Sequence, residues 1–222
     1  MNWLLFLFVV GMACKAEIID RIAVVVGNSV ITESEILREI RLTSFLNSTP
    51  LDFSLASKRK TAERLVEQHL IGAEAQASAY PAPDPDELEE SIKQTRGRFA
   101  NPALYKEALA HAGITEGQLK DHLAREIRTL GFLDFRFRPG IQINDDEIAK
   151  YFAEHVEPDL KKKHPGTDFS VDNYRARIEQ TLVSERLDKA SDAWLKESHE
   201  RTHIEFRPEV FPVEPPKEEA AK

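Results

Sequence analysis

The chain has 222 residues, of which 41% are hydrophobic and 31% are charged, a composition that supports one well-packed domain or two small ones. Its net charge of −8 argues against general binding to nucleic acid, because nucleic-acid-binding proteins present clustered positive charge. The single cysteine, Cys14, excludes an internal disulfide.

The N-terminal segment is typical of an export signal. An apolar run at 3–10 is followed by small residues at 11–16, and the whole is too short to span a bilayer. We therefore predict a signal peptide at residues 1–16 and a periplasmic location. Two processing routes stay open. Cleavage after Ala16 would leave a soluble protein, whereas Cys14 loosely resembles a lipobox cysteine and is a candidate for lipidation, which would anchor the chain to a membrane.

The next segment predicts a β-hairpin that leads into a helix. Residues 22–26 are mostly β-branched, Gly27-Asn28-Ser29 tolerates the backbone angles of a tight turn, and the apolar pattern resumes at Val30-Ile31. Thr32 and Glu35 then form a T-x-x-E capping box, the signature of a helix start.

Helix start signals recur along the rest of the chain. Asp84-Pro85 and Asn101-Pro102 place a capping residue before a proline, and Thr115 and Asn144 precede an amide or acid three residues later. Residues 202–206 alternate in polarity like a strand, and the proline-rich residues 208–222 predict a disordered tail. After the helix that Thr32 opens, we predict helices at about 54–79, from 85, at 102–113, 116–138, 144–157 and 170–200, with a loop at 158–169.

The segment Asp20–Ile36, DRIAVVVGNSVITESEI, resembles the start of SurA-type periplasmic chaperones. This resemblance implies a mainly α fold, a SurA-like chaperone core of about seven helices with a small N-terminal β-hairpin joined by a C-terminal strand. Residues 17–157 and 170–207 would form one domain. The loop at 158–169 stands where a parvulin isomerase domain, which needs roughly 100 residues, would be inserted. We therefore expect no enzyme activity.

Aromatic side chains are the compositional feature that points to a binding site. The chain has 12 phenylalanines and four tyrosines, most of which should lie in the core. Phe132, Phe135 and Phe137 spread over more than one face of their helix. With Tyr105 they are our candidate peptide-binding residues, the alternative being that they pack inside.

The function that the resemblance implies is ATP-independent binding of unfolded exported polypeptides, such as outer-membrane protein precursors. One alternative is an adaptor, lipid-anchored or soluble, that binds a single folded envelope partner; a peptidyl-prolyl isomerase is the less favoured alternative. We expect no cofactor, no metal and no nucleic-acid partner, because the sequence has no nucleotide-binding glycine loop and no histidine supported by a cysteine.

Overall fold

A computed structural model of the protein describes residues 20–212. The predicted signal peptide at 1–16, Cys14 and residues 213–222 lie outside the described residues. The part that is described is mainly α-helical with one small antiparallel sheet, which confirms the predicted fold class. Its elements are β1 (Ile22–Val26), β2 (Ser29–Thr32), α1 (Glu33–Asn47), α2 (Leu55–Ala77), α3 (Pro85–Gly97), α4 (Pro102–Ala112), α5 (Glu116–Phe137), α6 (Asp145–Tyr151), α7 (Glu157–Lys163), α8 (Arg175–Arg201) and β3 (Ile204–Phe206).

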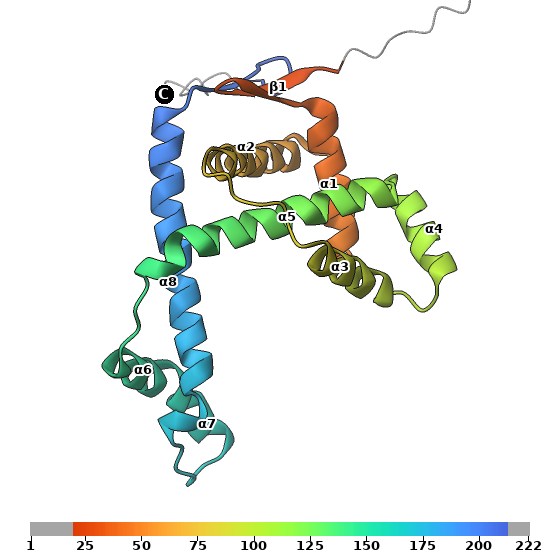
Figure 1. The fold of residues 1–222 in the computed structure, drawn as a ribbon. Helices are drawn as coiled ribbons and strands as arrows, with labels where there is room; N and C mark the ends of the chain where they lie inside the picture. The colour runs from red at the N-terminus through yellow and green to blue at the C-terminus, as the bar shows by residue number, and fades with distance from the viewer. Residues whose placement is uncertain (1–19, 213–222) are drawn as a thin grey trace, which may run out of the picture.

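The sheet joins the two ends of the described chain in the order β2-β1-β3 (Figure 1). Val26 pairs with Ser29 across a two-residue turn, in which Gly27 has a φ of 56°, a value that glycine adopts without strain. On its other edge β1 pairs antiparallel with β3, and the Gly27 amide donates a hydrogen bond to the carbonyl of His203 at 2.8 Å. The returning C-terminal strand is therefore present as predicted.

The helices begin where the local capping residues place them. Thr32, Thr115 and Asn144 each form a complete capping box, and Asp84 and Asn101 cap helices that begin with proline. Each cap satisfies backbone N–H groups that have no partner within the helix. These starts match the sequence predictions closely because capping is a short-range interaction.

Two segments differ from the sequence predictions. Residues 158–169 were expected to form a loop, but the first half is helical: α6 continues through a π-helical segment, Phe152–Val156, into α7. Pro158 is tolerated in the first turn of α7, and lysines stabilise its C-terminal turn. The disordered tail was expected from residue 208, yet Val210 and Phe211 are buried against the sheet, so the ordered chain extends to at least residue 212.

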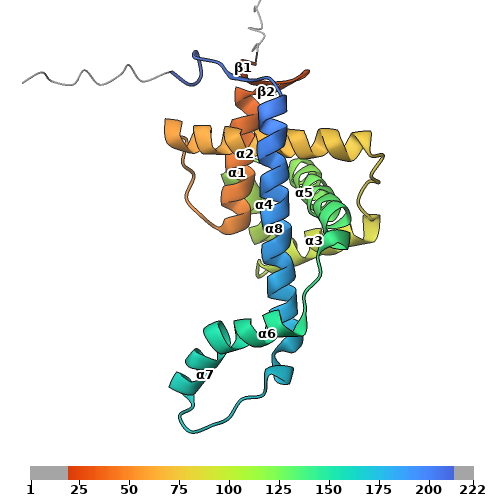
Figure 2. The ribbon, with the colours of Figure 1, turned by 90° about the vertical axis from the view of Figure 1, so that its left-hand side faces the viewer.

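Within residues 20–212 the interior consists of four apolar clusters rather than one. The first lies under the sheet between α1 and α2, the second between α1, α3, α4 and α5, and the third between α2, α5 and α8. The fourth joins α6, α7 and the first half of α8 in a lobe at the end of α8 away from the sheet (Figure 2). Helix α5 runs from α8 to α4 and so connects the third cluster to the second (Figure 1).

None of the helices that the structure describes is long and apolar enough to cross a membrane.

Candidate functional site

An open apolar groove lies between the C-terminal end of α1, the chain at 48–51 and helix α4; we call it the α1–α4 groove. Its volume is about 830 Å³. Leu51 and Leu104, on its two sides, are 40% and 45% exposed, and with the neighbouring aromatic side chains they form a contiguous apolar surface of the kind that binds ligands or partners. The residues that line the groove are Ser44, Phe45, Ser48, Thr49, Pro50, Leu51, Phe99, Leu104, Glu107, Ala108, His111 and Ala112.

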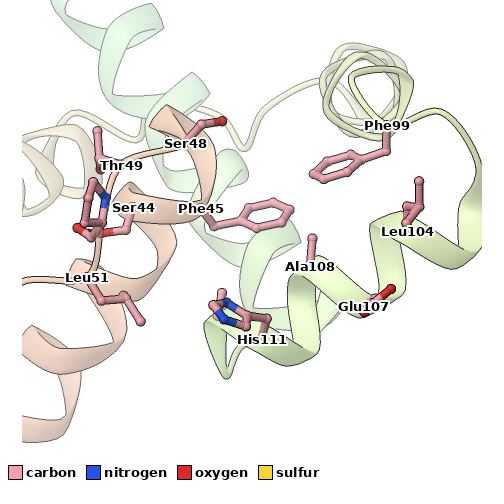
Figure 3. A pocket seen from close by; sticks show the side chains of 12 residues that line it. Ser44, Phe45, Ser48, Thr49, Leu51, Phe99, Leu104, Glu107, Ala108 and His111 are labelled. Atoms are coloured by element: carbon pink, nitrogen blue, oxygen red, sulfur yellow. Dashed lines mark hydrogen bonds between the residues drawn. The ribbon is translucent and has the colours of Figure 1, made fainter.

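Aromatic rings form one wall of the groove. Phe45 comes from α1 and Phe99 from the connection between α3 and α4, and the two rings point toward one another (Figure 3). They are stacked, with centroids 5.7 Å apart and planes inclined by 13°. Tyr105 packs edge-on against Phe99 at 5.6 Å, so three aromatic side chains from separate elements support the wall.

Local backbone features hold the two sides of the groove. Helix α1 ends at Ser48, which has the left-handed φ of 54°, and the chain then turns back so that the Thr49 amide donates to the Ser44 carbonyl at 3.0 Å. On the other side, Asn101 caps α4 by accepting a hydrogen bond from the Leu104 amide at 2.9 Å. Both turns are fixed by short-range hydrogen bonds, so the groove is a built feature of the fold.

Arg98 ties the end of α3, next to Phe99, to the end of α1. Its guanidinium donates to the carbonyl of Leu46 at 2.5 Å and to the hydroxyl of Ser48 at 3.2 Å, which joins the end of α3 to the end of α1. The position of Phe99, the next residue, therefore depends on this bridge. Arg98 is exposed, so we expect it to act by positioning rather than by adding much stability.

A buried charged network holds α1, α2 and α5 together. The Glu39 carboxylate is buried and accepts hydrogen bonds from Arg64 at 2.8 Å and from the Nδ1 atom of His122 at 3.1 Å. Burial alone would raise the pKa of Glu39, but the hydrogen bond from His122 and the charges of His122, Arg64 and Arg125 together lower it below its ordinary value. Glu39 therefore stays ionised and links three helices.

The ionisable residues of the groove lie at its surface or behind its aromatic wall. Glu107 and His111 are exposed on α4, and the Tyr105 hydroxyl is buried behind the wall, where burial raises the pKa of the phenol so that it stays neutral. Within residues 20–212 no group of three or more His, Cys, Asp or Glu side chains could hold a metal ion. The arrangement is suited to binding apolar groups.

The structure does not bring the four predicted peptide-binding residues together. Tyr105 is buried behind the groove wall, while Phe132, Phe135 and Phe137 lie at the other end of α5. Phe132 is 1% exposed and belongs to the third apolar cluster, so it is a core residue that presents no surface to a client. Phe137 is partly buried against Trp194, whereas Phe135 is 63% exposed. Peptide binding by Phe135 and Phe137 stays a prediction.

Sequence reasoning missed Phe45, Leu51 and Phe99 as groove residues. One signal was available for Leu51, since the connection at 48–54 carries two large apolar side chains, Leu51 and Phe53, where a surface loop is normally polar. Phe45 continues the apolar pattern of α1, and nothing local distinguishes it from a core residue.

The fold and groove together define a mainly α-helical protein with a small sheet and an open apolar groove between helices. No family model matches the chain. The chain is similar to the protein named Chaperone SurA from Cupriavidus pinatubonensis (strain JMP 134 / LMG 1197), with 24% identity over 194 residues. The match covers 83% of this chain and 38% of that relative, so the chain spans well under half of its length.

Proposed function

We propose that this protein is an ATP-independent periplasmic chaperone that binds unfolded exported polypeptides, with outer-membrane protein precursors among its clients. The observation that carries the proposal is the α1–α4 groove, where Leu51, Leu104 and a stacked aromatic pair are accessible to a ligand. An extended polypeptide can place successive apolar side chains in such a groove. The similarity to a protein named as a chaperone supports the same reading.

The groove also explains why binding would be reversible without nucleotide. Its lining is mostly apolar, so a client gains stability from burying side chains and not from a specific set of hydrogen bonds. Several weak contacts of this kind can be broken one at a time, so release needs no ATP. Export and a periplasmic location, which rest on the predicted signal peptide, are part of the proposal.

The test is suppression of aggregation of a denatured outer-membrane barrel protein, without ATP, by the protein purified from the envelope after expression of the full sequence. We expect suppression by the parent protein and a loss of it in Leu104→Ser. The matched control is Leu130→Ser, because Leu130 is also an exposed leucine on a helix but lies outside the groove. Equal suppression of aggregation by the two variants would show that clients do not bind in the α1–α4 groove. No suppression by the parent protein would favour the adaptor alternative.

The same preparation tests the absence of isomerase activity. We expect no acceleration of prolyl cis–trans isomerisation in a short peptide, because we place no parvulin domain in this chain. Acceleration that survives Leu104→Ser would contradict that part of the proposal without affecting the chaperone part.

A further inference from the structure

A second cavity lies in the lobe formed by α6, α7 and the first half of α8. Figure 2 shows this lobe at the end of α8 away from the sheet. Its volume is about 280 Å³, enough for one large side chain but not for a whole drug-sized ligand. It is lined by Tyr151, His155, Val156, Asp159, Leu160, Lys163, Tyr174, Arg177, Ile178 and Thr181. None of these residues belongs to the α1–α4 groove.

The floor of this lobe cavity is apolar and aromatic. Ile178 is 2% exposed, and Leu160, Val156, Tyr151 and Tyr174 are partly buried around it. The ring of Tyr151 lies 4.7 Å from that of His155, centroid to centroid. A flat or branched apolar side chain would find ring faces and aliphatic groups on several sides.

The cavity lining includes two positive side chains, Lys163 and Arg177, that have no acidic partner among residues 20–212. Asp159, the one acid in the lining, pairs with Lys162 at 3.3 Å, and the nearby Glu157 pairs with Lys161 at 2.8 Å. Among the described residues, Lys163 and Arg177 form no ion pair. The cavity therefore combines an apolar floor with an Arg and a Lys that are free to bind an anion, and guanidinium groups bind carboxylates in a bidentate manner.

The backbone of the lobe is also unusual at this point. His155 and Val156 lie on the π-helical segment Phe152–Val156, and such segments are rare and are found often at functional sites. Within this segment Phe152 is buried in the fourth cluster, whereas His155 is exposed at the cavity.

We propose that the lobe cavity binds the C-terminal end of a polypeptide whose last residue is aromatic or large and aliphatic. The last side chain would occupy the apolar floor, and the terminal carboxylate would meet Arg177 and Lys163 at the rim. The small volume favours a chain end over a larger ligand, because only one side chain is enclosed and the rest of the peptide extends into solvent. This site is separate from the proposed function and does not depend on it.

The test uses fluorescence anisotropy with the full chain and two labelled hexapeptides that end in phenylalanine, one with a free carboxylate and one with a C-terminal amide. We expect saturable binding of the acid and about tenfold weaker binding of the amide, the size of effect that a charged hydrogen-bonded contact supports. In Arg177→Gln the acid should bind as weakly as the amide, while amide binding should not change.

The matched control is Lys196→Gln, which removes a positive charge from an exposed position on the same helix, outside the cavity. It should bind both peptides like the parent. Equal binding of acid and amide, an equal loss of both in Arg177→Gln, the same loss in Lys196→Gln, or no saturable binding of the acid would each overturn the proposal. None of these results bears on aggregation suppression through Leu104, so the two proposals fail separately.

Discussion

Two aromatic-lined spaces lie between helices of this protein, one open and one filled. In the α1–α4 groove, the lining residues of α4 include the small side chains Ala108 and Ala112 beside Leu104, Glu107 and His111, and space is left for a ligand in front of Phe45 and Phe99. At the crossing of α5 and α8, which we call the α5–α8 seam, Phe132 and Phe137 meet Trp194, and the side chains fill the space themselves. Aromatic content therefore does not tell a binding surface from a core; the size of the side chain on the opposing helix does.

The largest effect is expected from emptying the filled space. Phe132→Ala should lower the free energy of unfolding by about 3–5 kcal/mol, because it deletes a fully buried ring. Phe135→Ala, which lies between Phe132 and Phe137 in the sequence but is largely exposed, should change it by no more than about 0.5 kcal/mol. Urea denaturation followed by circular dichroism measures both. Similar small values for the two variants would mean that the seam is not packed as described.

The buried network of Glu39, Arg64 and His122 should have the next largest effect on stability. Glu39→Gln should cost about 1–3 kcal/mol of unfolding free energy at neutral pH, since it removes the charge that Arg64 and His122 contact. The control is Glu63→Gln, an exposed helical pair with Arg59 that should cost less than about 0.5 kcal/mol.

The pH dependence of the Glu39→Gln effect has a definite sign. Because the folded state lowers the pKa of Glu39, its stabilising contribution is complete above the ordinary value of 4.5 and is lost as the pH falls through the lower folded value. The difference in unfolding free energy between the parent and Glu39→Gln should therefore shrink below about pH 4.5. A difference that grows with acidity would contradict the direction of the pKa shift.

A large side chain placed in the α1–α4 groove should fill it, as the aromatic side chains fill the α5–α8 seam. Ala108→Phe places a ring where α4 now has a methyl group, and we expect about tenfold weaker client binding, or about 1.4 kcal/mol, with the fold retained. Ala110→Phe, the same change on an exposed position of α4 outside the groove, should leave binding intact. Client binding is measured by aggregation suppression at graded protein concentrations. Full activity of Ala108→Phe would show that clients bind elsewhere.

The smallest effect on stability is expected from loss of the Arg98 hydrogen bonds that join the end of α3 to the end of α1. Arg98→Gln should cost only about 0.5–1 kcal/mol of global stability, but it should speed hydrogen exchange at the Thr49 amide, which bonds to the end of α1 beside Ser48. Arg138→Gln, which loses one exposed pair with Asp134, is the control and should leave that amide unchanged. An unchanged rate of hydrogen exchange at the Thr49 amide in both variants would show that Arg98 does not fix the position of the chain at 48–51.

Features that depend on neighbours in the sequence were predictable, and those that depend on distant neighbours were not. The capping boxes at Thr32, Thr115 and Asn144 mark helix starts because all their hydrogen bonds lie within four residues. Whether Phe99 or Phe132 is accessible depends on which helix faces it, and nothing within a few residues of either encodes that.

The two segments that differed from prediction have the same explanation. Residues 208–212 look like a disordered tail because two prolines bracket them, but Phe211 finds a partner in Phe206 and Arg59 once the sheet has formed. The lysines of α7 look like a solvated loop, but Leu160 beside them packs against the apolar cluster that contains Ile178 of α8. Once that contact has formed the helix, its dipole favours the lysines in the last turn.

The position of β1 in the middle of the sheet has a consequence for the order of folding. Its partner on one side follows at once, so the hairpin closes a very short loop, whereas Val26 meets Ile204 only after almost the whole described chain has been made. During synthesis, one edge of β1 therefore stays unpaired until the segment that contains β3 has been made. The sheet is therefore completed late in folding, and a chain that stops before residue 204 lacks β3 and cannot complete it.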